Sequence, residues 1–153
     1  MTLDFETNNF VGAGEAATFN ILKYLTNLEY RSLKEFRIRS GIYKQVPITW
    51  LLPVKVMENL SQSHLRGSID LMIMFDSRKI AIRVQGKGHG EILKGLGKAR
   101  HDQVQYDLLK NYCDVVDVKI QECPNVFKDL VSQKAIQEII DSFKTAGVMI
   151  PVL

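Results

Sequence analysis

One segment, residues 66–89 (RGSIDLMIMFDSRKIAIRVQGKGH), constrains the fold of this chain more than any other. It holds two short apolar stretches, 71–75 and 80–84, joined by a polar, turn-like sequence at 76–79. This pattern predicts a β-hairpin. The apolar residues are nearly continuous instead of alternating, so both faces of its strands are expected to be covered.

Polar residues mark the two strand ends that a hairpin brings side by side. Asp70 stands where the first strand begins, and the polar cluster at 85–89 follows the second. In an antiparallel pair the start of one strand lies beside the end of the next. We therefore expect Asp70, Gln85 and Lys87 to lie in one small volume at one edge of the sheet.

Helices and one further strand are expected around this hairpin. The i, i+3, i+4 spacing of apolar residues predicts helices over residues 14–30, 98–112 and 133–146. Gly147 is expected to end the last of them. Residues 115–120 (VVDVKI) predict a strand that arrives after a helix, so it can pair parallel to 80–84 through a right-handed crossover.

The order of these elements predicts an α/β fold, with a mixed central sheet flanked by helices on both faces. The length of 153 residues fits a single domain over 1–153, with residues 1–12 as a loosely held arm.

Alternation at 36–40 suits a half-exposed strand. Residues 49–56 predict an edge or kinked strand, because Pro53 interrupts them.

Charge permits nucleic-acid binding without requiring it. The net charge is +3 and the isoelectric point about 8.8. Five basic residues lie within or just after the polar cluster, with Glu91 the only acid among them: Lys87, Lys94, Lys98, Arg100 and His101. A solvated surface explains such a run as well as a phosphate-binding surface does.

Cysteine usage and hydropathy predict a cytoplasmic, intracellular protein. Cys113 and Cys123 fit no metal-binding spacing, so two free thiols in a reducing compartment are expected. The N-terminal residues lack the basic and apolar regions of a signal peptide. No apolar run approaches the ~20 residues of a membrane helix, so no membrane partner is expected.

An aspartate on one strand, followed on the next by a polar residue, any residue and a lysine, suits metal-dependent phosphodiester cleavage. Mg²⁺ prefers oxygen ligands, which Asp70, the Gln85 amide and the Gly86 carbonyl can supply. A bound metal lowers the pKa of its water and stabilises charge in the transition state. Lys87 shares a strand side with Gln85, so it is expected to orient that water and hold the phosphate.

The sequences GSID at 67–70 and VQGK at 84–87 resemble the core of the PD-(D/E)XK nuclease superfamily. The resemblance extends over the order of elements from about residue 14 to residue 120. It implies a restriction-endonuclease-like fold and a Mg²⁺- or Mn²⁺-dependent deoxyribonuclease that hydrolyses phosphodiester bonds in DNA.

The resemblance also implies individual roles. Asp70 matches the metal-binding aspartate, Gln85 the second ligand and Lys87 the catalytic lysine, while Glu15 on the first helix joins the metal site. The sequence departs from the pattern at Gln85, because the usual residue is an acid and an amide oxygen binds a divalent ion less strongly. A glutamate in the first turn of a helix is also favoured by the helix dipole alone, which is the structural alternative for Glu15.

Three subfamilies are similar to different parts of the motif, and they imply different DNA substrates. The strand sequences are most similar to archaeal-type Holliday junction resolvases and restriction-like endonucleases. Gly86 and His89 are placed as in very-short-patch repair endonucleases, and Gln103 and Tyr106 as in RecB-like exonucleases. A structure-selective junction or repair endonuclease, acting as a homodimer, is consistent with so short a chain.

Several side chains are expected to contact DNA: Lys94, Lys98, Arg100, His89 and Gln103. Arg37 and Arg39, expected on a strand edge, are weaker candidates. Two other readings stay open. One is a nuclease fold that binds nucleic acid or a partner protein without cutting, which Gln85 favours. The other is a structural subunit that pairs through the sheet edge at 36–53 with another chain.

Overall fold

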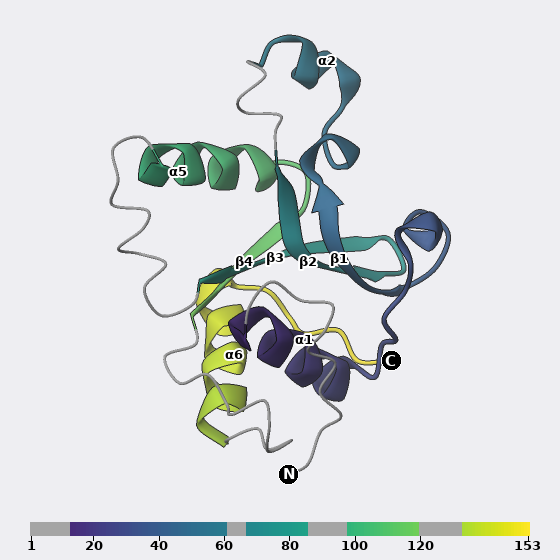
Figure 1. The fold of residues 1–153 in the computed structure, drawn as a ribbon, viewed down its shortest axis with the longest axis vertical. Coiled ribbons are helices and arrows are strands. Elements are labelled where there is room, and N and C mark those ends of the chain that lie inside the picture. The colour runs from purple at the N-terminus through teal and green to yellow at the C-terminus, as the bar shows by residue number, and fades with distance from the viewer. Residues whose placement is uncertain (1–12, 61–66, 86–97, 120–132) are drawn as a thin grey trace.

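The computed structural model describes residues 13–60, 67–85, 98–119 and 133–153. Within these ranges its helices and strands are α1 (Ala13–Thr26), β1 (Gly41–Pro47), α2 (Val54–Glu58), β2 (Ser68–Phe75), β3 (Arg78–Gln85), α5 (Lys98–Leu109), β4 (Asp114–Lys119) and α6 (Gln133–Ala146). Two short 3₁₀ helices, η1 (Leu33–Glu35) and η2 (Ile48–Trp50), flank β1. Figure 1 shows α1 and α6 together on one side of a single sheet and α5 on the other.

The sheet is mixed, as the sequence predicts. Its four strands lie in the order β1-β2-β3-β4, with β1 and β3 antiparallel to β2 and β4 parallel to β3. The hairpin turn is confirmed but is shorter than expected, because the strands extend up to a two-residue turn at Asp76 and Ser77. The α/β class with helices on both faces is therefore observed among the described elements.

Two apolar clusters cover the two faces of the sheet. The first joins α1 and α6 to the sheet and includes Phe19, Leu22, Ile73, Ile82 and Ile139. The second joins η1, η2 and α5 to the opposite face and includes Phe36, Tyr43, Met72, Ala81 and Leu109. Full burial of a large apolar side chain stabilises a fold by roughly 1.5–3 kcal/mol. These two layers hold β2 and β3 rigidly between them.

The alternation of side chains along β1 and β2 is interrupted near one end. Ile42 packs in the first cluster, but Val46, an even number of residues later, packs in the second. On β2, Leu71 belongs to the first cluster and Ile69 to the second. The interruption coincides with Gln45, whose φ is +51°. In Figure 1 the ends of β1 and β2 that border α2 rise away from the rest of the sheet.

Several sequence predictions are confirmed. The last helix has the predicted bounds and ends at Gly147, whose φ is +72° and whose N–H donates to the Lys144 carbonyl at 3.0 Å. The strand at 114–119 pairs parallel to β3. Helix α1 ends four residues earlier than expected, because Asn27 adopts a left-handed φ of +60°.

Two predicted strands are wrong. Residues 36–40 form a turn after η1, where the buried Phe36 ring packs edge-on against Tyr43 at 5.2 Å between ring centres. Residues 49–56 hold the end of η2 and the start of α2, not an extended strand. Pro53 lies directly before α2, where its missing N–H is not needed, so it starts a helix instead of kinking a strand. The edge strand is 41–47, between the two segments.

Among the described residues, no helix combines the length and the apolar character needed to cross a bilayer. The N-terminal arm expected at 1–12 lies outside the described residues.

Candidate functional site

Glu15 lies in the first turn of α1 and points toward the sheet. It precedes Phe19 and Leu22 by one and two helical turns, so all three side chains project from the face that packs on the sheet. Only 8% of Glu15 is exposed. Its Oε1 accepts a hydrogen bond from the Gln45 side-chain Nε2 at 3.2 Å. Burial and a specific partner distinguish Glu15 from a solvated acid that only serves the helix dipole.

The carboxylates of Glu15 and Asp70 are close enough to affect each other. Burial raises the pKa of Glu15 above its ordinary value, and the negative charge of Asp70 raises it further. The Gln45 hydrogen bond and the positive charge of Lys44 act in the opposite direction and lower that pKa. The fold thus brings together an acid from the first helix and an acid from the second strand, a pair that the resemblance assigns to one metal site.

Asp70 lies inside β2, at the point where β2 parts from β3. The antiparallel register of these strands runs from Phe75 only as far as Leu71. One residue further, the Asp70 Oδ2 accepts the Val84 main-chain N–H at 3.0 Å. The carboxylate therefore accepts a main-chain N–H of β3 at the point where the regular pairing with β2 has ended. This hydrogen bond anchors Asp70 next to Gln85. This half-buried position differs from a turn cap in front of the strand.

Gln45 is a member of this site that sequence reasoning misses. The register of β1 with β2 pairs Lys44 with Leu71 and Val46 with Ile69, which sets Gln45 opposite Asp70. The two wrong strand predictions fall on either side of it, so no pattern assigns it a partner. The only available signal is a pair of polar residues, KQ, inside the otherwise apolar sequence IYKQVP.

Gln85 is the last residue of β3, and its main chain pairs with Lys119 of β4. The Gln85 side chain lies outside the described residues, as do the other predicted members of this cluster, Gly86, Lys87 and His89. The structure therefore brings two of the four predicted catalytic side chains together and brings the main chain of a third to the same strand end.

The predicted DNA contacts are described only in part. Lys94 lies outside the described residues, and Lys98 and Arg100 lie in the first turn of α5 without described side chains. Gln103 is exposed on α5, and its Nε2 donates to the Asp107 Oδ1 at 3.0 Å. Helix α5 itself packs on the face of the sheet opposite α1.

Arg37 and Arg39 do not lie on a strand edge, which corrects the sequence prediction. Both are exposed in the turn that follows η1. Arg39 is 3.7 Å from the Glu35 carboxylate, four residues earlier. Phe36 is buried against Tyr43, and this contact closes the turn and excludes the extended strand that the alternating sequence favours.

A second polar cluster lies at the other edge of the sheet. Arg83 of β3 is buried and binds Asp117 of β4 with two hydrogen bonds, Nε to Oδ1 at 2.7 Å and Nη2 to Oδ2 at 2.8 Å. Its guanidinium carbon lies 5.2 Å from the centre of the Tyr106 ring on α5. Tyr106 thus packs a helix onto a buried ion pair, which is a structural task.

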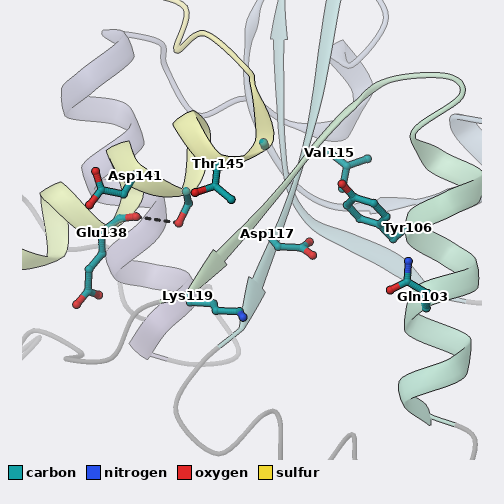
Figure 2. Close-up of a pocket in the computed structure, with 10 residues that line it drawn as sticks. Gln103, Tyr106, Val115, Asp117, Lys119, Glu138, Asp141 and Thr145 are labelled. Carbon is teal, nitrogen blue, oxygen red and sulfur yellow. Dashed lines mark hydrogen bonds between the residues drawn. The ribbon is translucent and has the colours of Figure 1, made fainter.

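An open cleft of about 660 Å³ adjoins this second cluster, between α5, β4 and α6 (Figure 2). Its lining includes the carboxylates of Asp117, Glu138 and Asp141 but one lysine, Lys119. In Figure 2 Asp117 and Gln103 lie on the α5 side of the cleft, while α6 forms the opposite wall. The excess of carboxylates makes this cleft a poor phosphate site.

The donor atoms at the first site fit a hard divalent cation. Glu15 and Asp70 offer carboxylate oxygens, which Mg²⁺ and Mn²⁺ prefer over nitrogen or sulfur. The mutual influence of the two acids is also a repulsion that a cation would relieve. Groups of three or more His, Cys, Asp or Glu side chains placed to hold a metal do not occur among the described residues. Among the described residues, any further ligand here would be an amide or a main-chain oxygen.

Comparison with known proteins does not identify a family. No protein-family model, no curated protein and no solved structure matches the chain. The resemblance to PD-(D/E)XK nucleases therefore depends on the residues of the motif and on the geometry described above.

Proposed function

We propose that this chain is a metal-dependent deoxyribonuclease of the PD-(D/E)XK type, which hydrolyses phosphodiester bonds in DNA. One observation carries the proposal: Glu15 from α1 and Asp70 from β2 meet beside the end of β3, where the sequence continues as Gln85-Gly86-Lys87. The order of elements supports it, since the resemblance implies a helix, a hairpin sheet, a helix and a strand, and the described elements follow one another in this order.

Each residue has a distinct part in this proposal. Glu15 and Asp70, with the Gln85 amide and the Gly86 carbonyl, would hold Mg²⁺ or Mn²⁺. When bound, such an ion supplies a more acidic water and positive charge near the phosphate. Lys87 would donate hydrogen bonds to the scissile phosphate and orient the attacking water. The Val84 N–H keeps the Asp70 carboxylate at the strand end throughout.

The same proposal extends to the partners. We propose that DNA approaches over the basic run at 87–101, with Lys94, Lys98 and Arg100 on its phosphates and with His89 and Gln103 nearby. Each phosphate contact would steepen the salt dependence of binding. A homodimer would present two such sites to a junction or a repair intermediate, because symmetric pairing doubles a small surface.

Cleavage of labelled duplex, single-stranded, nicked and four-way-junction DNA in Mg²⁺, Mn²⁺ or EDTA tests the proposal. We expect metal-dependent cutting that falls about 100-fold or more in Asp70→Asn and Lys87→Ala, since each removes a group that acts on the reacting phosphate. Asparagine keeps an oxygen for the Val84 N–H, so Asp70→Asn removes the charge with little change of shape.

The matched control is Asp76→Asn, the same change in the exposed turn of the same hairpin. It should cut like the wild type. A folded wild type that binds DNA equally with and without EDTA, and never cuts it, would contradict the nuclease proposal.

A second function is favoured by a specific observation. The Asp70 carboxylate already holds the Val84 N–H, and the neighbouring ligand position is an uncharged amide, Gln85. A nuclease fold that binds DNA or a partner protein without cutting needs neither a free Asp70 carboxylate nor an acidic second metal ligand. Gln85→Glu separates the two functions: restored acidity should increase divalent-ion affinity and cutting if the site is catalytic, and should weaken DNA binding if the site only binds.

A further inference from the structure

Gln45 occupies a backbone conformation that its residue type does not favour. Its φ of +51° lies in the left-handed region, which glycine, asparagine and aspartate enter more readily than glutamine. It does so inside β1, two residues before the end of the strand and opposite Asp70, where the side-chain alternation of both strands is interrupted. Unfavourable backbone conformations that the surrounding structure maintains gather at functional sites, so this one points to a functional role for the Gln45 side chain.

The contacts of Gln45 run from β2 through β1 to α1. The Ser68 hydroxyl donates to the Gln45 Oε1 at 2.5 Å, and the Gln45 Nε2 donates to the Glu15 Oε1 at 3.2 Å. Because the serine donor holds the amide oxygen, the amide nitrogen is turned toward Glu15. A glutamate side chain has three rotatable bonds, and this bridge restricts them from outside the helix.

We propose that Gln45 is a positioning residue, which holds the Glu15 carboxylate in the orientation that binds a divalent cation together with Asp70. The inference rests on the proposed function, since it assigns Glu15 to that cation. It adds a residue that the motif does not contain. The hydrogen bond fixes one oxygen of the carboxylate, and the buried backbone of α1 fixes its base. Loss of a residue that hydrogen-bonds to a metal ligand and orients it commonly lowers metal affinity about 10-fold or more.

Gln45→Asn is the direct test. Asparagine accepts the left-handed backbone at least as well as glutamine, but its amide is one methylene shorter and does not span from Ser68 to Glu15. Gln45→Gly is the second variant, because glycine adopts this φ without strain and removes the whole side chain. It is expected to fold even if the asparagine variant rearranges locally. The matched control is Gln137→Asn, the same shortening at an exposed position on α6.

The measurements are Mn²⁺ binding by calorimetry without DNA, thermal unfolding without metal, and cleavage of the preferred DNA. We expect Mn²⁺ affinity to fall about 10-fold in both Gln45 variants and not in the control. The unfolding temperature should change little, because relief of the left-handed backbone strain offsets the two lost hydrogen bonds. A lower unfolding temperature with unchanged Mn²⁺ affinity would overturn the inference in favour of a purely structural bridge, and so would affinity within twofold of the wild type.

The wild type separates this inference from the proposed function. If it binds Mn²⁺ and cuts DNA while the Gln45 variants do the same, the inference fails and the nuclease stands. If a folded wild type neither binds Mn²⁺ nor cuts any DNA of the panel, the nuclease proposal fails, and the role assigned to Gln45 fails with it.

Discussion

Two regions of this molecule place carboxylates between the sheet and a helix, and they differ in the charge of the group that lies beside each carboxylate. At the edge of β4, Asp117 meets the guanidinium of Arg83 in a two-bond ion pair that Tyr106 covers. Where β2 parts from β3, Glu15 meets a second acid, Asp70, and the charge of one raises the pKa of the other. One region pairs its carboxylate with a buried guanidinium, whereas the other places two carboxylates close together, and Lys44 only partly offsets their effect on each other.

This difference separates a structural cluster from a candidate reaction site. A buried ion pair with satisfied hydrogen bonds needs no ligand, and its loss is felt as lost stability. Two neighbouring acids in a partly buried site oppose folding at neutral pH, and such shifted groups gather at functional sites. The first kind of region should respond to mutation in unfolding experiments, and the second in metal binding and cleavage.

Arg83→Ala should give the largest loss of stability. It leaves Asp117 partly buried without the guanidinium and removes one of the two cations that lie over the Tyr106 ring, the other being Lys110. We expect the free energy of unfolding to fall by about 3 kcal/mol, as when one partner of a buried pair is removed. Urea unfolding measures it. Asp70→Asn should change stability by less than about 1 kcal/mol while it lowers the proposed cleavage about 100-fold or more. Equal losses of stability in both variants would contradict the distinction between a structural cluster and a candidate reaction site.

Glu15→Gln should act in the opposite direction and increase stability at neutral pH in the absence of metal. The folded-state pKa of Glu15 lies above its ordinary value of 4.5, so the folded protein binds this proton more tightly than the unfolded chain does. Stability contributed by the protonated form is therefore complete below about pH 4.5 and is lost as the pH rises through the raised pKa. Glutamine does not titrate and avoids this loss.

Urea unfolding at pH 4 and pH 7 checks the sign. The stability advantage of Glu15→Gln over the wild type should be larger at pH 7 than at pH 4, and saturating Mn²⁺ should reduce or reverse it, because only the wild type gains from the ion. Glu138→Gln, on the partly exposed side of α6, is the matched change elsewhere. An advantage of Glu15→Gln that shrinks between pH 4 and pH 7 would contradict the proposed repulsion.

The same two regions show how far the sequence predicts the molecule. Continuous apolar stretches and helical spacing predict the hairpin, the helix at 133–146 and a parallel strand at 115–120, which is observed at 114–119, since burial on one or both faces leaves a periodic pattern. The pairing of Glu15 with Asp70 is what the resemblance implies and not what a periodic pattern predicts, and in the structure the charge of Asp70 acts on Glu15.

Other parts of the site leave no periodic pattern. The strand at 41–47 is missed because two polar residues and a change of side-chain face at Gln45 break its alternation. The alternating sequence at 36–40 is misread because the burial of Phe36 against Tyr43 is a tertiary contact. The ion pair of Arg83 with Asp117 depends on the register of two strands 34 residues apart in sequence, and composition does not reveal such a register.

The smallest effect is expected at a second ion pair between the same two strands. Arg78 of β3 lies 3.7 Å from Asp114 of β4, and the two side chains are 36% and 50% exposed, compared with 9% and 29% for Arg83 and Asp117. The charges and the strands are alike, so the two pairs differ mainly in burial and geometry. Water already solvates the outer pair, so its attraction is weak.

Arg78→Ala should therefore lower the free energy of unfolding by less than about 1 kcal/mol, part of it from the lost hydrogen bond to the Met149 carbonyl. Urea unfolding at low and high salt measures both pairs, and salt should weaken the outer pair more than the inner one. If Arg78→Ala cost as much as Arg83→Ala, burial would not explain the stability of the inner pair. The contrast between a self-balanced cluster and a site that concentrates charge would then lose its physical basis.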